Sequence, residues 1–257
     1  MVPCPILNLD RSTDRLADIT AQFLRIGMPF ERVPAIDGRK PLPDHVRGFL
    51  QGKDGQFAAS MQPGERGCYA SHIAVWQRIA SGAYGAAALV CEDDIILPDD
   101  LREVLDEIVG KAPSGWDVIR LSSHAKRAVV SVVSLRAGRH LVRYSRHPVY
   151  SGATLVSQAG ARKLIRPFLR TVIIDQDLRR PWLFGLDAYG VTPQLVQQPV
   201  NASLIHAFGG RAANRLNLRD PLRRLRYGLR TLGAAQWVRC AAWNAFGRKL
   251  GPNASMP

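Results

Sequence analysis

Apolar positions along residues 1–170 change period from segment to segment, and the period predicts which segments are strands and which are helices. Short, nearly continuous apolar runs are typical of buried strands, whereas apolar side chains that recur every three or four residues are typical of helices. The predicted strands cover residues 4–9, 30–36, 86–91, 117–121 and 150–157, with one or two more in 128–144. The predicted helices cover residues 13–26, 64–82, 100–109 and 159–169.

This alternation of strands and helices predicts an α/β sheet. In such sheets, ligands bind beyond the carboxyl ends of the strands. Residues 38–63 are rich in glycine, proline and charge, and we interpret them as a long loop with room for one helical turn. The helix at 64–82 carries apolar residues on more than one face, so we expect it to be largely buried.

Basic residues gather after residue 210, and we therefore expect a main domain over 1–210 and a basic amphipathic helical tail over 211–257. In the tail, leucines recur at helical spacing and arginines follow an adjoining edge. This pattern is typical of a helix that lies on an anionic membrane. A helix that packs its leucines on the core and turns its arginines to solvent explains the pattern about as well. The leucines are Leu222, Leu225, Leu229 and Leu232, and the arginines are Arg219, Arg223, Arg226 and Arg230.

The composition, with 46% apolar residues in a chain of 257, is that of a globular protein with a sizeable core. No apolar stretch reaches the roughly 18 residues that a membrane-spanning helix needs. The N-terminal segment is too short in its apolar part for a signal peptide. The four cysteines, Cys4, Cys68, Cys91 and Cys240, are far apart and form no CxxC pair, so we expect reduced thiols in a cytoplasmic protein.

The net charge of +14 is unevenly spread, because residues 211–257 hold ten arginines or lysines against one acid, Asp220. A strongly basic segment raises the hypothesis of nucleic-acid binding. That hypothesis predicts aromatic residues interleaved with basic ones, and the leucine stripe of the tail does not fit it. We therefore expect contact with an anionic membrane surface through residues 211–250 rather than with nucleic acid.

Three consecutive acids, Glu92, Asp93 and Asp94, follow the predicted strand at 86–91. Like charges at that range repel, and burial raises the cost. A hard divalent cation such as Mg²⁺ or Mn²⁺ prefers carboxylate oxygens and keeps open positions for phosphates. From spacing alone, a solvated acidic turn explains the acids about as well as a metal site.

Six segments of the chain, in order and spanning roughly residues 4–206, resemble the conserved blocks of glycosyltransferase family 25, the bacterial lipooligosaccharide sugar transferases. The segments are ILNLDRSTDR (6–15), FERVPAIDGR (30–39), GERGCYASH (64–72), ALVCEDDIIL (88–97), YSGATLVSQAGARKLI (150–165) and IDQDLRRPWLFGLDAYGVTPQLVQQ (174–198). The resemblance implies a GT-A-like fold, an α/β sandwich that binds a nucleotide-diphosphate sugar.

The resemblance also implies a metal motif at the strand end, where Glu92 stands in place of the first aspartate of the usual motif. We expect Asp94 and Glu92 to hold Mn²⁺ or Mg²⁺, with Glu92 or Asp93 contacting the ribose or a water on the metal. His206 is expected as a late-arriving metal ligand, and an ordinary surface histidine is the alternative.

The donor nucleotide is expected where the first strand ends. Carboxylates there can contact the base or ribose, and guanidinium groups can contact the phosphates. The alternative is a helix cap with local ion pairs. The expected donor-binding residues are Asn8, Asp10, Arg11, Arg15, Asp37, Ser71, His72, Glu92, Asp93, Ser151 and Gly152.

A transferase that inverts the anomeric carbon needs one general base for the acceptor hydroxyl. Asp175 resembles the family's aspartate in its block and is the first candidate, with Asp177 second. A pair of acids that stabilises a helix N-terminus is the alternative. Arg179 and Arg180 can neutralise the diphosphate or pair with these acids.

The function that follows is transfer of a hexose, galactose from UDP-galactose, onto a lipopolysaccharide-type or other cell-surface glycan, with inversion and metal assistance. A nucleotide-sugar-binding relative without activity, a metal-dependent phosphohydrolase and a nucleic-acid-binding protein are the alternatives.

Overall fold

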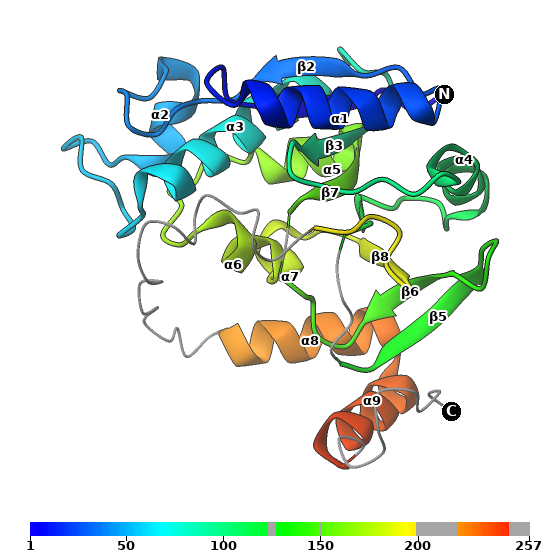
Figure 1. Ribbon diagram of the computed structural model, residues 1–257. Helices are drawn as coiled ribbons and strands as arrows, with labels where there is room; N and C mark the ends of the chain where they lie inside the picture. Colours follow the sequence, from blue (N-terminus) through cyan, green and yellow to red (C-terminus); the bar gives the residue numbers. More distant parts are fainter. Residues whose placement is uncertain (123–126, 150, 199–219, 247–257) are drawn as a thin grey trace.

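The computed structural model describes residues 1–122, 127–149, 151–198 and 220–246. Within them, the chain forms an eight-stranded mixed sheet in the order β2-β1-β3-β7-β4-β8-β6-β5 (Figure 1), which confirms the α/β class. The strands are β1 (Pro5–Asn8), β2 (Glu31–Pro34), β3 (Ala87–Glu92), β4 (Val118–Arg120), β5 (Val129–Ser134), β6 (His140–Tyr144), β7 (Ala153–Ser157) and β8 (Ala188–Thr192). The helices are α1 (Thr13–Arg25), α2 (Asp44–Leu50), α3 (Pro63–Ala80), α4 (Leu101–Lys111), α5 (Gln158–Leu164), α6 (Ile174–Leu178), α7 (Pro181–Phe184), α8 (Asp220–Leu232) and α9 (Ala234–Phe246).

The ends of four strands, β1, β2, β3 and β7, meet on one side of the sheet. β1 pairs in parallel with both β2 and β3, so the carboxyl ends of these strands point the same way. β7 runs antiparallel to β3, and its amino end therefore lies beside the carboxyl end of β3, where the Glu92 amide donates to the Gly152 carbonyl at 2.8 Å. Asn8, Glu92 and Gly152 are distant in sequence, and the topology places them at the same edge.

Helices cover both faces of the sheet (Figure 1). Side chains of α1 and α4 pack on one face, and those of α2, α3 and α5 pack on the other. Along β3, Leu89 and Cys91 belong to the first core, whereas Ala88 and Val90 belong to the second. A strand that is buried on both faces needs apolar residues at nearly every position, which explains the continuous apolar run that predicted it.

Helix α3 packs directly on the backbone that follows β2. A Cβ atom at Gly38 would lie 2.0 Å from the Pro63 carbonyl oxygen, and one at Gly67 would lie 2.4 Å from the Ile36 carbonyl oxygen. No larger residue fits at either position, so the contact fixes the start of α3 against the sheet. Most residues of α3 are buried, as its two-faced apolar pattern predicted.

The structure contains elements that the apolar pattern did not predict. In the predicted loop at 38–63, α2 spans two turns, because Val46 and Leu50 are buried. Residues 174–192 form α6, α7 and β8, none of which we predicted. The pattern of β8 is interrupted by Gly190, where a Cβ atom would lie 1.9 Å from the Tyr144 hydroxyl oxygen. The glycine is therefore required by packing across the sheet, which sequence spacing does not reveal.

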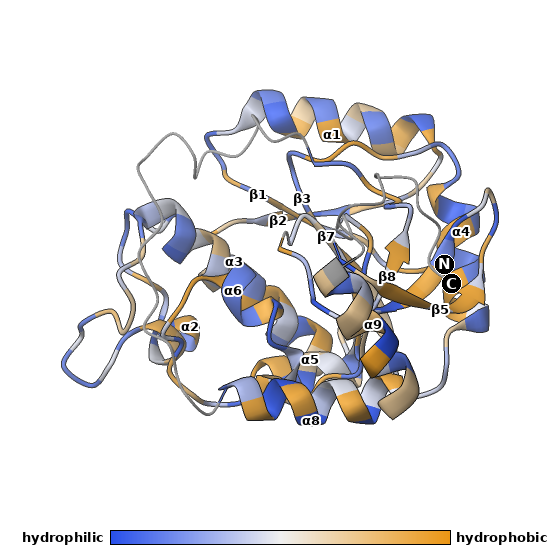
Figure 2. Cartoon of the chain, turned by 90° about the horizontal axis from the view of Figure 1, so that it is seen from below, coloured by the Kyte–Doolittle hydropathy of each residue, from blue (hydrophilic) through white to orange (hydrophobic). Residues whose placement is uncertain are grey.

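The described part of the tail consists of α8 and α9, and α8 (Asp220–Leu232) covers the segment whose leucines recur at helical spacing. Tyr227 anchors α8: it is 7% exposed, and its ring centroid lies 5.8 Å from that of His147 and 5.9 Å from that of Trp182. The leucines are not the anchor, since Leu222 is 63% exposed and Leu229 is 39% exposed. Hydrophobic residues (orange) and hydrophilic residues (blue) alternate along α8 in Figure 2. The boundary predicted near residue 210 lies outside the described residues, and no helix among the described ones is long and apolar enough to cross a membrane.

Candidate functional site

A cavity of about 480 Å³ opens where β1, β2 and β3 end and α3 begins. Its floor includes apolar side chains from the strand ends, such as Leu7 and Ile36, and its rim carries charged groups. The cavity brings together eight of the residues predicted for donor or metal binding: Arg11, Arg15, Asp37, Ser71, His72, Glu92, Asp93 and Asp94. A mixed wall of this kind can pack an apolar ring and bind an anion at its edge.

Asp93 and Asp94 share one guanidinium group. Arg15 Nη1 donates to Asp93 Oδ1 at 3.3 Å and lies 3.8 Å from Asp94 Oδ2. Asn8 Nδ2 donates to the other oxygen of Asp93 at 2.7 Å. Asn8 is buried and does not line the cavity, so it positions Asp93 rather than facing a ligand.

Glu92 accepts hydrogen bonds from three directions. Ser151 Oγ donates to its Oε1 at 2.6 Å, His72 Nε2 lies 3.1 Å from the same oxygen, and Gln198 Nε2 donates to Oε2 at 3.3 Å. Burial raises the pKa of Glu92, but these bonds, with His72 the strongest, more than offset it and lower the pKa below its ordinary value. Glu92 is therefore held as a carboxylate.

The pKa of Asp94 shifts in the opposite direction from that of Glu92. Gln198 Nε2 also donates to Asp94 Oδ1, at 2.9 Å, so one amide group contacts both acids. Burial and the nearby charge of Glu92 raise the pKa of Asp94 to about 7, despite Arg15 and Gln198. When Asp94 is ionised, Arg15 and Gln198 therefore do not fully compensate the negative charge that it adds to that of Glu92. Two converging carboxylates with a surplus of charge fit a divalent cation, so Asp94 and Glu92 could hold Mn²⁺ or Mg²⁺.

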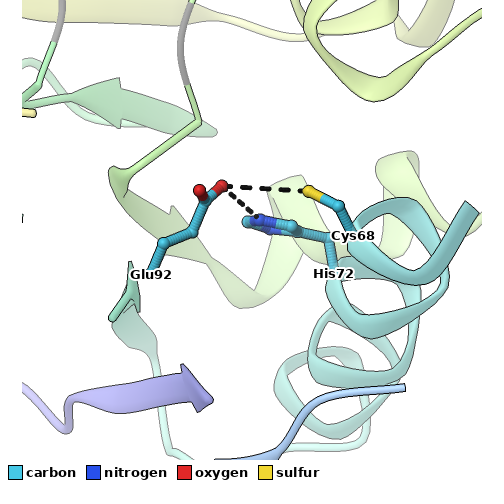
Figure 3. Close-up of side chains that lie close together, drawn as sticks. All are labelled: Cys68, His72 and Glu92. Atoms are coloured by element: carbon cyan, nitrogen blue, oxygen red, sulfur yellow. Dashed lines mark hydrogen bonds and ion pairs between the residues drawn. The ribbon is translucent and has the colours of Figure 1, made fainter. Parts of the chain in front are cut away.

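Cys68 and His72 both approach Glu92 from α3 (Figure 3). The Cys68 sulfur lies 4.0 Å from Glu92 Oε1, and the ligand atoms of all three residues lie within 4.8 Å of one another. Burial, followed by the charges of Glu92 and Asp175, raises the pKa of the Cys68 thiol well above its ordinary value. Cys68 and Gln198 were not among the residues predicted for the site. The four-residue spacing of Cys68 and His72 on a predicted helix was the available signal for the first. For the second, the only signal was its place at the end of the family-like segment 174–198.

Arg11 and Asp37 also line the cavity. Arg11 Nη1 donates to Asp37 Oδ2 at 2.6 Å, and Arg39 Nη2 donates to the same oxygen at 2.7 Å. The bond from Arg39, with the charge of Arg11, holds the pKa of Asp37 below its ordinary range. Asp10 lies outside the cavity, where it pairs with Arg32 at 2.5 Å.

Ser71, Ser151 and Gly152 position the groups that surround the cavity. Ser71 Oγ donates to the Gly67 carbonyl at 2.6 Å and accepts from the Ile36 amide at 2.8 Å, so it ties α3 to the segment after β2. Ser151 holds Glu92, and Gly152 lets Gln198 approach, because a Cβ atom at Gly152 would lie 2.6 Å from Gln198 Oε1. These residues position other side chains and do not line the cavity, except for Ser71.

The two candidate bases lie in different environments. Asp177 is 3% exposed and accepts from the Tyr69 hydroxyl at 2.6 Å and from Arg180 Nη2 at 2.8 Å. These bonds give Asp177 a structural role between α6 and α3. Asp175, on the same helix, lies within electrostatic range of Cys68 and of the buried Arg120. Neither aspartate lines the cavity. Because Asp177 is held by these two bonds, Asp175 stays the first candidate for the general base. His206 lies outside the described residues.

Residues 1–168 match the family model described as glycosyltransferase family 25 (LPS biosynthesis protein). The chain belongs to glycosyltransferase family 25. Family-25 proteins of Aedes aegypti and Drosophila pseudoobscura pseudoobscura are 28% and 32% identical to it, over 66% and 67% of this chain. The human inactive glycosyltransferase 25 family member 3 is 27% identical over 67% of this chain.

The matched part of the chain spans only 29–30% of the length of these family-25 relatives. Among solved structures, the chain is similar to a glycosyltransferase involved in the glycosylation of the major capsid of PBCV-1. The sequence identity is 7% and the TM-score 0.34, over 63% of this chain and 62% of that one. At this level the structural similarity carries no argument about function.

Proposed function

We propose that this family-25 chain transfers a hexosyl group from a nucleoside diphosphate sugar to a hydroxyl group of a surface glycan. UDP-galactose is the proposed donor, and a lipopolysaccharide-type glycan is the proposed acceptor. The observation that carries the proposal is the pairing of Arg15 with Asp93 and Asp94 at the rim of the cavity. Cationic and anionic groups side by side suit a diphosphate and its counter-ion.

The proposed fold is GT-A-like, with the acids at the carboxyl end of β3 and the nucleotide beyond β1 and β2. Arg11 and Arg15 bind the diphosphate, because a guanidinium group matches phosphate oxygens in charge and geometry. Asp37 and Asp93 contact the ribose or the base. The apolar floor formed by Leu7 and Ile36 packs against the base.

Asp94 and Glu92 hold Mn²⁺ or Mg²⁺ in this proposal. When bound, the ion stabilises the negative charge of the departing diphosphate. His72, Ser151 and Gln198 keep Glu92 ionised and oriented.

Asp175 acts as the general base and takes the proton of the acceptor hydroxyl. The acceptor oxygen then attacks the anomeric carbon in line with the departing diphosphate, so the configuration inverts. Asp177 keeps α6 in place through Tyr69 and Arg180. Its bonds leave it unsuited to collect the proton.

A second candidate function is nucleotide-sugar binding without transfer. Two observations favour it: Glu92 stands where the usual motif has aspartate, and a similar human protein is named inactive. Release of UDP from UDP-galactose in the presence of manganese and a lipopolysaccharide acceptor tests the choice. Turnover that requires acceptor and is lost in Asp94→Asn, but kept in Asp18→Asn on the exposed side of α1, supports transfer. Nucleotide binding without turnover supports the second candidate.

The tail is proposed to place the enzyme on the cytoplasmic face of an anionic membrane, where a lipid-linked acceptor lies. Leu222, Leu229 and Val238 are exposed, at 63%, 39% and 59%. Arg223 and Arg226 are exposed on the same helix as the two leucines. Exposed apolar side chains beside cations suit an interface with anionic lipids, where each cation contributes about 1 kcal/mol.

A further inference from the structure

Cys68, His72 and Glu92 form a compact set of three ligands from two elements (Figure 3). Cys68 and His72 are one helical turn apart on α3, so their side chains point from the same face. Glu92 meets them from the end of β3, and the three ligand atoms lie within 4.8 Å of one another. All three residues line the cavity, which leaves a fourth position open toward it.

Rigid neighbours hold these ligands in place. The close contact of Gly67 with Ile36 fixes the turn of α3 that carries Cys68. The His72 ring is 2% exposed and packs against Trp76, with ring centroids 5.7 Å apart. The set therefore exists before any ion binds, and small rotations of side chains are enough to close it around one.

The donor atoms select a different kind of ion from the one that Asp94 attracts. Thiolate and imidazole are ligands for zinc and its neighbours in the first transition row, whereas Mg²⁺ and Mn²⁺ prefer carboxylate oxygens. Three protein ligands with one open position are also the usual arrangement of an accessible zinc site.

We propose that Cys68, His72 and Glu92 form a binding site for a borderline divalent transition ion of the zinc class. On ligation the thiol loses its proton to solvent and the thiolate forms the metal–sulfur bond. Glu92 also belongs to the proposed manganese site, so the two ions exclude each other. Zinc should therefore inhibit transfer by removing Glu92 from manganese, a consequence that rests on the proposed function, whereas the binding itself does not.

Cobalt(II) titration of the full chain tests the binding, because a cobalt–thiolate bond gives a charge-transfer band in the near ultraviolet. The expected result is one cobalt ion per chain with that band, displaced by zinc. The band should be lost in Cys68→Ser and kept in Cys240→Ser, whose cysteine lies on α9. Absence of the band in the wild type, or its survival in Cys68→Ser, would overturn the proposal.

Wild-type protein provides a second readout if Cys68→Ser does not fold. Zinc should protect Cys68 from alkylation by iodoacetamide, as read by mass spectrometry of its peptide, and magnesium should not. Equal labelling with and without zinc would contradict the site. For the consequence, zinc should inhibit transfer more strongly in the wild type than in Cys68→Ser, each relative to its own zinc-free rate. A chain that transfers nothing but gives the cobalt band refutes the proposed function and keeps this site. A chain that transfers sugar but gives no cobalt band keeps the proposed function and refutes this site.

Discussion

His72 Nε2 lies 3.1 Å from Glu92 Oε1 and joins the buried helix α3 to the carboxyl end of β3. The histidine is 2% exposed, so the contact is shielded from solvent. The three consecutive acids at this strand end repel one another, and they differ in the partners that stabilise them. An imidazole supports Glu92, a guanidinium group supports Asp93, and Asp94 is left with the least compensation.

Replacing His72 with leucine should destabilise the protein by about 1–3 kcal/mol, since the half-buried Glu92 carboxylate loses a partner. Because the folded-state pKa of Glu92 lies below its ordinary 4.5, its contribution to stability is present above pH 4.5 and is lost as pH falls. Urea unfolding at pH 7 and pH 4 measures the difference, which should shrink at the lower pH. The exposed His45→Leu is the control and should cost little. Equal costs at the two histidines would contradict the role of His72.

Asp94→Asn should stabilise the metal-free protein at high pH. The pKa of Asp94 rises from 3.8 when unfolded to about 7 when folded, so the folded state binds more protons between these values. Wild-type stability therefore falls as pH rises from about 4 to about 8, by at most about 4 kcal/mol at ~1.4 kcal/mol per pH unit. The variant should lack that loss, and Asp18→Asn should retain it. Thermal unfolding without metal from pH 4 to pH 8 is the measurement, and parallel curves for wild type and Asp94→Asn would refute the assignment.

Replacing the two aspartates of α6 one at a time should cause two different kinds of defect. Asp175→Asn should lower kcat by about 10²–10⁴, the usual contribution of a general base, and leave the melting temperature and UDP binding near wild type. Asp177→Asn should instead destabilise the fold, because Tyr69 and Arg180 lose their buried partner. Steady-state kinetics beside thermal unfolding measures both. If Asp175→Asn keeps full kcat, the base lies elsewhere.

The tail should bind vesicles that contain phosphatidylglycerol. Charge reversal at Arg226 and Arg230 should weaken binding by at least about 1 kcal/mol per residue, roughly fivefold each. Co-sedimentation at low and high salt is the measurement, and binding should fall as salt screens the charges. Arg102→Glu, on the exposed side of α4, is the matched control. Binding that is indifferent to the tail substitutions would remove the membrane from the proposal.

The sequence predicted the parts of the site that depend on local pattern. The apolar run of β3 placed the three acids at its end, and the two-faced pattern of α3 predicted its burial. Local pattern does not predict contacts between residues that are distant in the sequence. Gln198 meets Glu92 and Asp94 through an approach that only the glycine at 152 permits. Strand β8 was missed because Gly190 serves a contact with Tyr144, which spacing along the chain does not encode.

The same limit applies to the roles of individual residues. The family resemblance ranked Asp175 before Asp177 as the candidate base, and the burial and two hydrogen bonds of Asp177 add a structural reason for that order. Cys68 lies in a segment that resembles a family block but had no expected role, and the fold places its sulfur 4.0 Å from Glu92 Oε1. Local pattern thus indicated the candidate site, whereas contacts between distant segments are needed to propose what each residue does there.

The acids at the end of β3 are proposed to form a metal-dependent donor site. A thermal-shift titration with UDP and UDP-galactose, with and without manganese, tests it most directly, because a ligand that binds the native state raises its melting temperature. We expect a shift that requires manganese in the wild type and in Asp18→Asn and is lost in Asp94→Asn. A manganese-dependent shift that persists in Asp94→Asn, or no shift with either nucleotide, would contradict the account.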